Sequence, residues 1–297
     1  MATVLQWPAY RASDDLLTDG IQQRLARWNH QRLSPRLPDD DWRLVLDRDQ
    51  EMLGLEASLL EALREGVREE AAEVPSDPQA FVRWFEDLKD SGPGQGDPLF
   101  PWLAQRANLS QMRWYLRQEA AGEAGFEDLT AYTQVKLPAR IKLELARNYW
   151  DEMGRGNAKG MHGPMLAHLV EELQLEPRIE HTAWESLALA NVMTAMATRR
   201  DHAWHSLGAL GVIELTAPGR SAAVAEGLRR LGVDGKARVY FELHATLDVK
   251  HSLAWNEEAI MPAVAEDPRR ARAIAEGALI RLNCGARCFE RYRRDLW

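Results

Sequence analysis

The stretch His244-Ala-Thr-Leu-Asp248-Val-Lys-His251 decides how the rest of this sequence is interpreted. It lies in a run from residue 235 to 261 that has no proline or glycine after Gly235, so we predict one long helix there. At about 100° per residue, the two histidines and the aspartate fall within roughly 60° of one another. Such polar groups on a face that also carries aromatic residues are costly unless they are paired or bind a metal. The pattern therefore predicts either a hydrogen-bonded polar cluster or a metal site.

A second segment brings another carboxylate and another histidine close together in the sequence. Glu152 continues an apolar helical stripe, and His162 follows ten residues later, after Gly154 and Gly156 have interrupted the helix. A mixed set of nitrogen and oxygen ligands suits iron, manganese or zinc better than magnesium or calcium.

Two further helices are each expected to carry a carboxylate on their apolar face. Glu119 follows the stripe of Leu109, Met112 and Leu116, and Glu214 follows a similar stripe that starts at Ala203. Carboxylates and histidines that converge from four helices are typical of helical proteins with a dimetal-carboxylate centre.

The motif Asp151-Glu152-x-Gly154-x-Gly156-x5-His162, followed about eighty residues later by His244-x3-Asp248-x2-His251, resembles the haem-oxygenase-like diiron oxidases and oxygenases, often called iron-containing redox enzymes. The resemblance covers roughly residues 100–265. It implies an all-α, haem-oxygenase-like helical bundle. It also implies a ligand set, in which Glu123 and Glu127 are alternatives to the first member: Glu119, Glu152, His162, Glu214, His244, Asp248 and His251.

One position departs from the family pattern. Some members have a carboxylate three residues before the histidine that matches His162, and this sequence has Lys159 there. An ammonium group cannot serve as a ligand and is repelled by nearby cations. We therefore expect Lys159 to point away from the centre. Either one of the two irons is held more weakly, or Glu214 substitutes for the missing ligand.

The resemblance also implies an activity. It predicts an O2-dependent non-haem diiron oxidoreductase with two Fe(II) ions, O2 as co-substrate and no haem, in which N-oxygenation of a small amine or amino-acid-like substrate is favoured. Oxidative decarboxylation or C–C cleavage is the alternative within the same class. A hydrolase or small-molecule binding protein without redox chemistry, built on the same fold, is the alternative from another class.

The sequence is expected to be helical almost throughout, because it has few clusters of β-branched residues and no hairpin signals. Residues 1–98 are predicted to form a helical extension that packs on the core or forms an interface, and residues 99–297 the diiron core. Helical periodicity marks 16–28, 41–53, 56–73 and 78–90 in the extension. Pro218-Gly219 is expected to end a helix.

Composition limits the partners. The 37 basic and 45 acidic residues give a formal net charge of −8, and there is no basic stripe for nucleic acid. No apolar run is long enough to cross a bilayer, and the first residues lack a signal-peptide pattern, so we expect a cytoplasmic protein. Cys284 and Cys288 are predicted to be free thiols. A small-molecule substrate is expected, and an external electron donor and a homodimer are both compatible with the sequence.

Two other groups of residues offer competing interpretations. His202 and His205, next to Asp201, form a rival metal pair, although a charged helix turn is the simpler interpretation. The second group consists of four basic residues that could bind a substrate carboxylate: Lys136, Arg140, Lys142 and Arg147. The simpler interpretation is that they lie on an exposed helix face.

Overall fold

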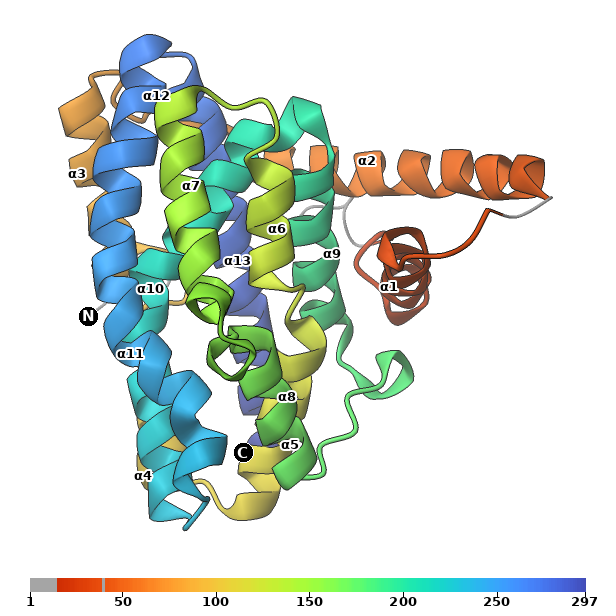
Figure 1. The fold of residues 1–297 in the computed structure, drawn as a ribbon, viewed down its shortest axis with the longest axis vertical. Helices are drawn as coiled ribbons and strands as arrows, with labels where there is room; N and C mark the ends of the chain where they lie inside the picture. The colour runs from red at the N-terminus through yellow and green to blue at the C-terminus, as the bar shows by residue number, and fades with distance from the viewer. Residues whose placement is uncertain (1–14, 39–40) are drawn as a thin grey trace.

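The computed structural model describes residues 15–38 and 41–297, and these residues are almost entirely helical (Figure 1). They contain no strand; the only β-type pairing among them is an isolated bridge between Met153 and Met161. The predicted all-α helical bundle is confirmed for the described residues. None of the described helices combines the length and apolar character that crossing a bilayer requires.

The α-helices follow one another along the chain with short connections, several of them formed by single turns of 3-10 helix. In chain order they are α1 (Asp19–Leu33), α2 (Trp42–Ala72), α3 (Pro78–Ser91), α4 (Leu99–Gln105), α5 (Leu109–Gly122), α6 (Phe126–Thr133), α7 (Ala139–Glu152), α8 (His162–Glu172), α9 (Trp184–Thr198), α10 (Ala203–Arg230), α11 (Gly235–Trp255), α12 (Met261–Glu266) and α13 (Arg270–Leu296).

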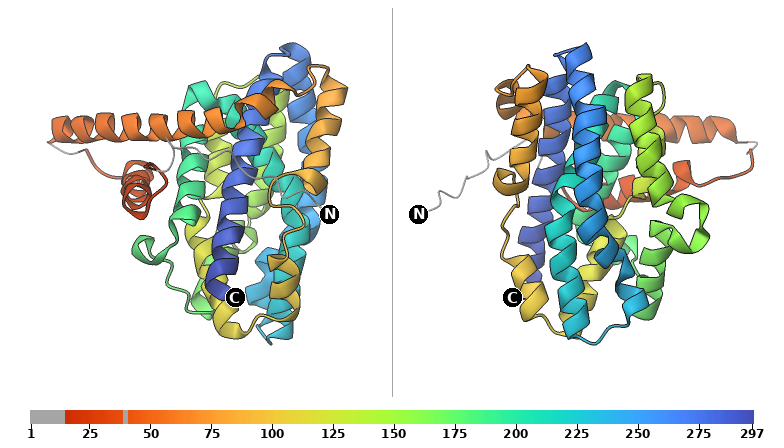
Figure 2. Two further views of the ribbon diagram at one scale, coloured as in Figure 1. Left: turned by 180° about the vertical axis from the view of Figure 1, so that it is seen from behind. Right: turned by 60° about the vertical axis from the view of Figure 1, so that its left-hand side comes forward.

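Helices α9, α10 and α13 form the centre of the bundle. Helix α9 is buried on nearly every side, so its sequence has little amphipathic pattern. Helix α10 packs against α11 on one side and α13 on another. Figures 1 and 2 show α10, α11 and α13 running along the long axis of the molecule, with α5 to α8 on the neighbouring side.

The prediction that Pro218 ends a helix is wrong. Helix α10 continues through Pro218 and Gly219 to Arg230. A proline inside a helix leaves the carbonyl four residues earlier without its usual donor, and here that carbonyl belongs to Glu214. Packing of α10 against several neighbouring helices outweighs this local cost.

The predicted long helix over residues 235–261 forms, but not as a single α-helix. Helix α11 is regular from Gly235 to Trp255, a π-helical turn follows over Asn256–Ile260, and α12 begins at Met261. Pro262, near the start of α12, lacks a backbone N–H, which explains why the hydrogen-bond pattern changes at this point.

Helices α1 to α3 contain most of the described residues before position 98. The periodic segments 41–53 and 56–73 join into the single helix α2. Its second half packs against α13 and α9, while its first half extends away from the bundle with α1 beside it (Figures 1 and 2). Buried side chains from α1, α2 and α3 belong to the same apolar core as α9, α10 and α13. Whether residues 1–98 also form an interface stays a prediction.

Two glycines allow α10 and α13 to approach closely. A Cβ atom added at Gly277 would lie 1.9 Å from the carbonyl oxygen of His205, and one added at Gly208 would lie 1.9 Å from that of Ile274. Each glycine therefore faces the backbone of the partner helix, which cannot move aside as a flexible side chain could.

We predict that Gly277→Ala destabilises the protein by about 1–3 kcal/mol, because the added methyl group forces α10 and α13 apart. The matched control is Gly54→Ala in α2, where a Cβ atom meets nothing within 4 Å. That variant should gain about 0.5–1 kcal/mol from helix propensity alone. Urea unfolding followed by circular dichroism measures both values, and equal stability of the two variants would contradict the close-contact argument.

Candidate metal centre

A compact loop positions the first two acid and imidazole groups. Glu152 is the last residue of α7, and His162 is the first residue of α8. The bridge between Met153 and Met161 closes the loop between them. Gly154 has φ +59°, and a Cβ atom there would lie 2.3 Å from the carbonyl carbon of Gly160. The glycine is thus required for the loop to close and to bring Glu152 and His162 together.

The first candidate metal group consists of Glu152, His162 and His244, whose potential ligand atoms lie within 4.8 Å of one another. Nδ1 of His162 lies 2.6 Å from Oε2 of Glu152, and the rings of His162 and His244 have centroids 4.6 Å apart. Nδ1 of His244 lies 2.6 Å from the carbonyl oxygen of Tyr240 one turn earlier, to which it can donate a hydrogen bond. This bond fixes the ring and leaves Nε2 of His244 available to a metal.

The second candidate group shares Glu152 with the first. It consists of Glu152, Glu214 and His251, again with potential ligand atoms within 4.8 Å of one another. Nδ1 of His251 lies 3.4 Å from Oε2 of Glu214, and its Nε2 lies 3.1 Å from Oδ2 of Asp151. The amide of Asn148 donates a hydrogen bond to the other oxygen of Glu214. Both ligand side chains are therefore held in place by neighbouring polar groups.

Asp248 is buried beside both groups on α11, one turn after His244. Burial raises its pKa well above the usual range, and the negative charges of Glu214 and Glu152 raise it further. Burial alone would lower the pKa of His251, but Glu214 and Asp151 outweigh it and raise the pKa to about 9. Burial, followed by the nearby His162, lowers the pKa of His244 to about 4.

Several buried polar atoms of this cluster lack a hydrogen-bond partner among the described residues. They include Nδ1 of His162, Nδ1 of His251 and Oδ1 of Asp248. Nδ1 of His162 lies very close to Oε2 of Glu152, yet the two do not form a well-aligned hydrogen bond. Unpartnered buried nitrogen and oxygen atoms that face a shared space fit a site for cations. The donor set fits iron, since it combines imidazoles with carboxylates.

The structure brings six of the seven predicted ligands together and leaves Glu119 apart from them. One oxygen of Glu119 accepts a hydrogen bond of 3.0 Å from the Tyr292 hydroxyl. Burial raises the pKa of Glu119, and the charges that lower it again include Arg220 and Arg281. The apolar stripe of α5 does place Glu119 in the cavity wall, but at a different part of the cavity.

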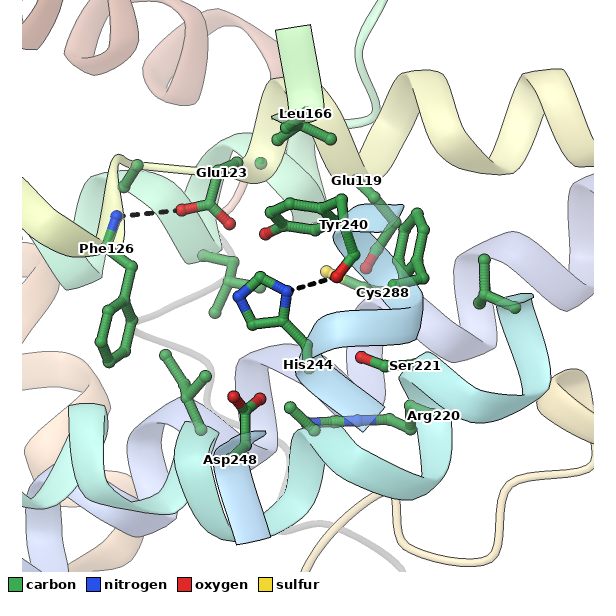
Figure 3. Close-up of a pocket in the computed structure, with 18 of the residues that line it drawn as sticks. Glu119, Glu123, Phe126, Leu166, Arg220, Ser221, Tyr240, His244, Asp248 and Cys288 are labelled. Atoms are coloured by element: carbon green, nitrogen blue, oxygen red, sulfur yellow. Dashed lines mark hydrogen bonds between the residues drawn. The ribbon is translucent and has the colours of Figure 1, made fainter. Parts of the chain in front are cut away.

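The two alternatives to Glu119 lie nearer to the metal groups. Burial raises the pKa of Glu123 to about 7, and Glu127 and Glu152 contribute to the rise. Glu123 is surrounded by protein atoms, yet part of its surface is open to solvent, and its side chain lines the cavity and faces that space (Figure 3). Its Oε1 accepts backbone hydrogen bonds from Gly125 and Phe126. Neither Glu123 nor Glu127 belongs to a three-residue metal group in the described chain.

A cavity of about 160 Å³ extends from these groups into the bundle. Figure 3 shows Tyr240, His244 and Asp248 projecting into it from α11, with Glu123 on the facing wall. Further apolar and aromatic residues complete the wall; they include Phe100, Phe126, Leu189, Met193, Ile213 and Phe289. The cavity has the mixed polar and apolar lining of a small-molecule site, and its volume is below the roughly 300–1,000 Å³ of pockets for drug-sized ligands, so it suits a smaller molecule.

The competing groups of residues lie elsewhere. Nε2 of His205 is 2.9 Å from Oε2 of Glu276, and the same oxygen accepts a hydrogen bond from Arg64 of α2. The cation of Arg64 makes this position unfavourable for a metal. Lys159 is exposed on the loop before His162, as expected. Arg140 and Arg147 pair with Glu258 and Glu144 and are absent from the cavity wall.

Comparison with known proteins agrees with this geometry. The family model described as iron-containing redox enzyme matches residues 113–286. The chain therefore belongs to the iron-containing redox enzymes. The match takes in all seven residues predicted as ligands.

Two crystal structures of a CADD-like protein of unknown function from Nostoc punctiforme have a similar fold. They share 15% and 16% sequence identity with this chain, with TM-scores of 0.55 and 0.57. Each similarity covers 75% of this chain and, respectively, 96% and 99% of the other. A comparison with curated proteins found no match.

We predict that His251→Ala lowers the iron content of protein loaded anaerobically with Fe(II), because the second group loses its only imidazole. The matched control is His168→Ala, which removes an exposed histidine of α8. Iron is measured by inductively coupled plasma mass spectrometry after desalting. Equal iron content in both variants would show that His251 is not a ligand.

A second prediction concerns the residue that supports His251. Asp151→Asn removes the negative charge beside Nε2 of His251 while keeping the size of the side chain. Partners of this kind contribute about 10–100-fold to metal affinity. Competition with a chromogenic chelator should reveal a loss of that order at one of the metal positions. Unchanged affinity would mean that Asp151 only forms an ion pair with Arg155.

Proposed function

We propose that this protein is an O2-dependent non-haem diiron oxygenase that acts on a small amine or amino-acid-like molecule. The observation that carries the proposal is the pair of three-residue groups that share Glu152. One carboxylate between two imidazole-containing groups suits two metal ions held side by side. Membership of the iron-containing redox enzymes makes iron the metal of choice.

The protein's own residues would divide the work as follows. Glu152, His162 and His244 would hold one iron, and Glu152, Glu214 and His251 the other, with Asp248 close to both. Bound Fe(II) would supply the activation of O2, which side chains alone do not provide. The apolar walls of the cavity would limit the access of water while the substrate occupies it.

The favoured reaction is N-oxygenation. One oxygen atom of O2 would enter an N–H bond of the substrate and give a hydroxylamine. The other would leave as water after uptake of two electrons and two protons, with the electrons supplied by an external donor. Glu123 faces the cavity and has a pKa of about 7, so its carboxyl group can hold or release a proton near neutral pH.

The proposal predicts that anaerobic protein binds about two Fe(II) per chain and that exposure to O2 then produces a transient visible absorption. The loop position of Lys159 offers no carboxylate, so we expect the Fe(II) titration to show one tight and one weaker step. The paired control is Glu152→Gln, which alters the residue common to both groups and should abolish the absorption. A Soret band would point to haem, and a metal-bound protein that consumes no O2 with any amine would favour a non-redox function.

A further inference from the structure

Two arginines line the same cavity and lie in different helices. Arg220 belongs to α10 and Arg281 to α13. The charges that act on Arg220 are those of Arg281, Glu119 and Tyr115, none of which belongs to the two candidate metal groups. Figure 3 shows Arg220 beside Ser221 on α10, reaching toward the interior.

Neither guanidinium group forms an ion pair within residues 15–38 and 41–297. Nε and Nη1 of Arg281 are buried and have no hydrogen-bond partner there. Arg220 donates a hydrogen bond of 2.7 Å to the Thr216 hydroxyl, and its guanidinium carbon lies 5.5 Å from the centre of the Phe289 ring. These neutral contacts do not offset a cation that has been removed from water.

The nearby carboxylate compensates only part of this charge. Glu119 interacts with both arginines, but one of its oxygens already accepts the hydrogen bond from Tyr292. Burial, followed by the charge of Arg281, lowers the pKa of Arg220 to about 10, so Arg220 remains charged at neutral pH. The other carboxyl group that interacts with Arg281 is Glu123 of the cavity wall, whose pKa of about 7 leaves it partly protonated at neutral pH. Two cations thus face the carboxylate of Glu119 and the partly charged carboxyl group of Glu123 in the cavity wall.

We propose, on the basis of the proposed function, that Arg220 and Arg281 form a subsite for the carboxylate of the substrate. Arginine binds a carboxylate through charged N–H donors that lie in one plane, and Nε and Nη1 of Arg281 are both buried donors without a partner. Around the subsite, Phe100, Val224 and Phe289 provide an apolar surface for the rest of the molecule.

One helix, α10, carries residues of both parts of the site. The backbones of Glu214 and Arg220 lie six residues apart on it, which corresponds to about 9 Å along the helix axis. A substrate that spans this distance has its carboxylate at the arginines and its other end at the candidate metal groups. The carboxylate is then remote from the oxidised atom, which favours oxidation of a distal amine over oxidative decarboxylation.

The test measures binding to metal-free protein, so that its outcome does not depend on iron. The probes are 6-aminohexanoate, hexanoate and 3-phenylpropionate, each compared with its primary amide by isothermal titration calorimetry. We expect at least one acid to bind more tightly than its amide. Arg281→Gln should weaken that binding by about 10–100-fold, since one charge-assisted interaction contributes roughly 1.5–3 kcal/mol.

The matched control is Arg294→Gln, which removes an exposed arginine of the same helix outside the cavity and should leave binding unchanged. Thermal unfolding of the two variants separates binding from folding: without its unpartnered cation, unliganded Arg281→Gln should melt no lower than the wild type. If no acid binds more tightly than its amide, or if both variants weaken binding equally, the subsite is wrong. Failure of iron loading alone would overturn the proposed function and leave the subsite intact.

Discussion

The candidate metal centre depends on Glu152, the carboxylate that the two groups share. This residue ends α7, and the tight loop from Met153 to Met161 returns the chain so that His162 faces it. Any residue type other than glycine at position 154 would place its Cβ atom against the backbone of Gly160. This loop brings together Glu152 of α7 and His162 of α8, and the packing of α10 and α11 adds Glu214, His244 and His251.

Buried charge determines the character of the cavity at both ends. At one end, carboxylates and imidazoles lie so close together that burial and mutual charge shift the pKa values of Asp248, His244 and His251. At the other, Arg220 and Arg281 exceed the compensation that Glu119 provides. Metal cations would offset the excess negative charge at the carboxylates and imidazoles, and a substrate carboxylate would offset the positive charge at the arginines. The proposed substrate would therefore bind with its carboxylate at the arginines and its other end at the metal groups.

The close approach of α10 and α13 supports this arrangement. Gly208 and Gly277 allow the two backbones to touch, and both helices contribute residues to the cavity wall. Glu214 and Arg220 come from α10, while Arg281 and Cys288 come from α13. Any separation of these helices would change the shape of the cavity as well as the stability of the core.

The sequence alone determined the helical class, and it predicted six residues that the structure brings together, because helical periodicity and residue spacing act over a few turns of one chain segment. It placed His244, Asp248 and His251 on one face, and α11 carries them as expected. It could not decide which of Glu119, Glu123 and Glu127 lies nearest to the metal groups, since a helical stripe shows only which face of its own helix a residue occupies. It also missed Arg220 and Arg281, and the continuation of α10 through Pro218. These features depend on which helices pack against one another, and only the tertiary structure brings residues from α5, α10 and α13 around one space.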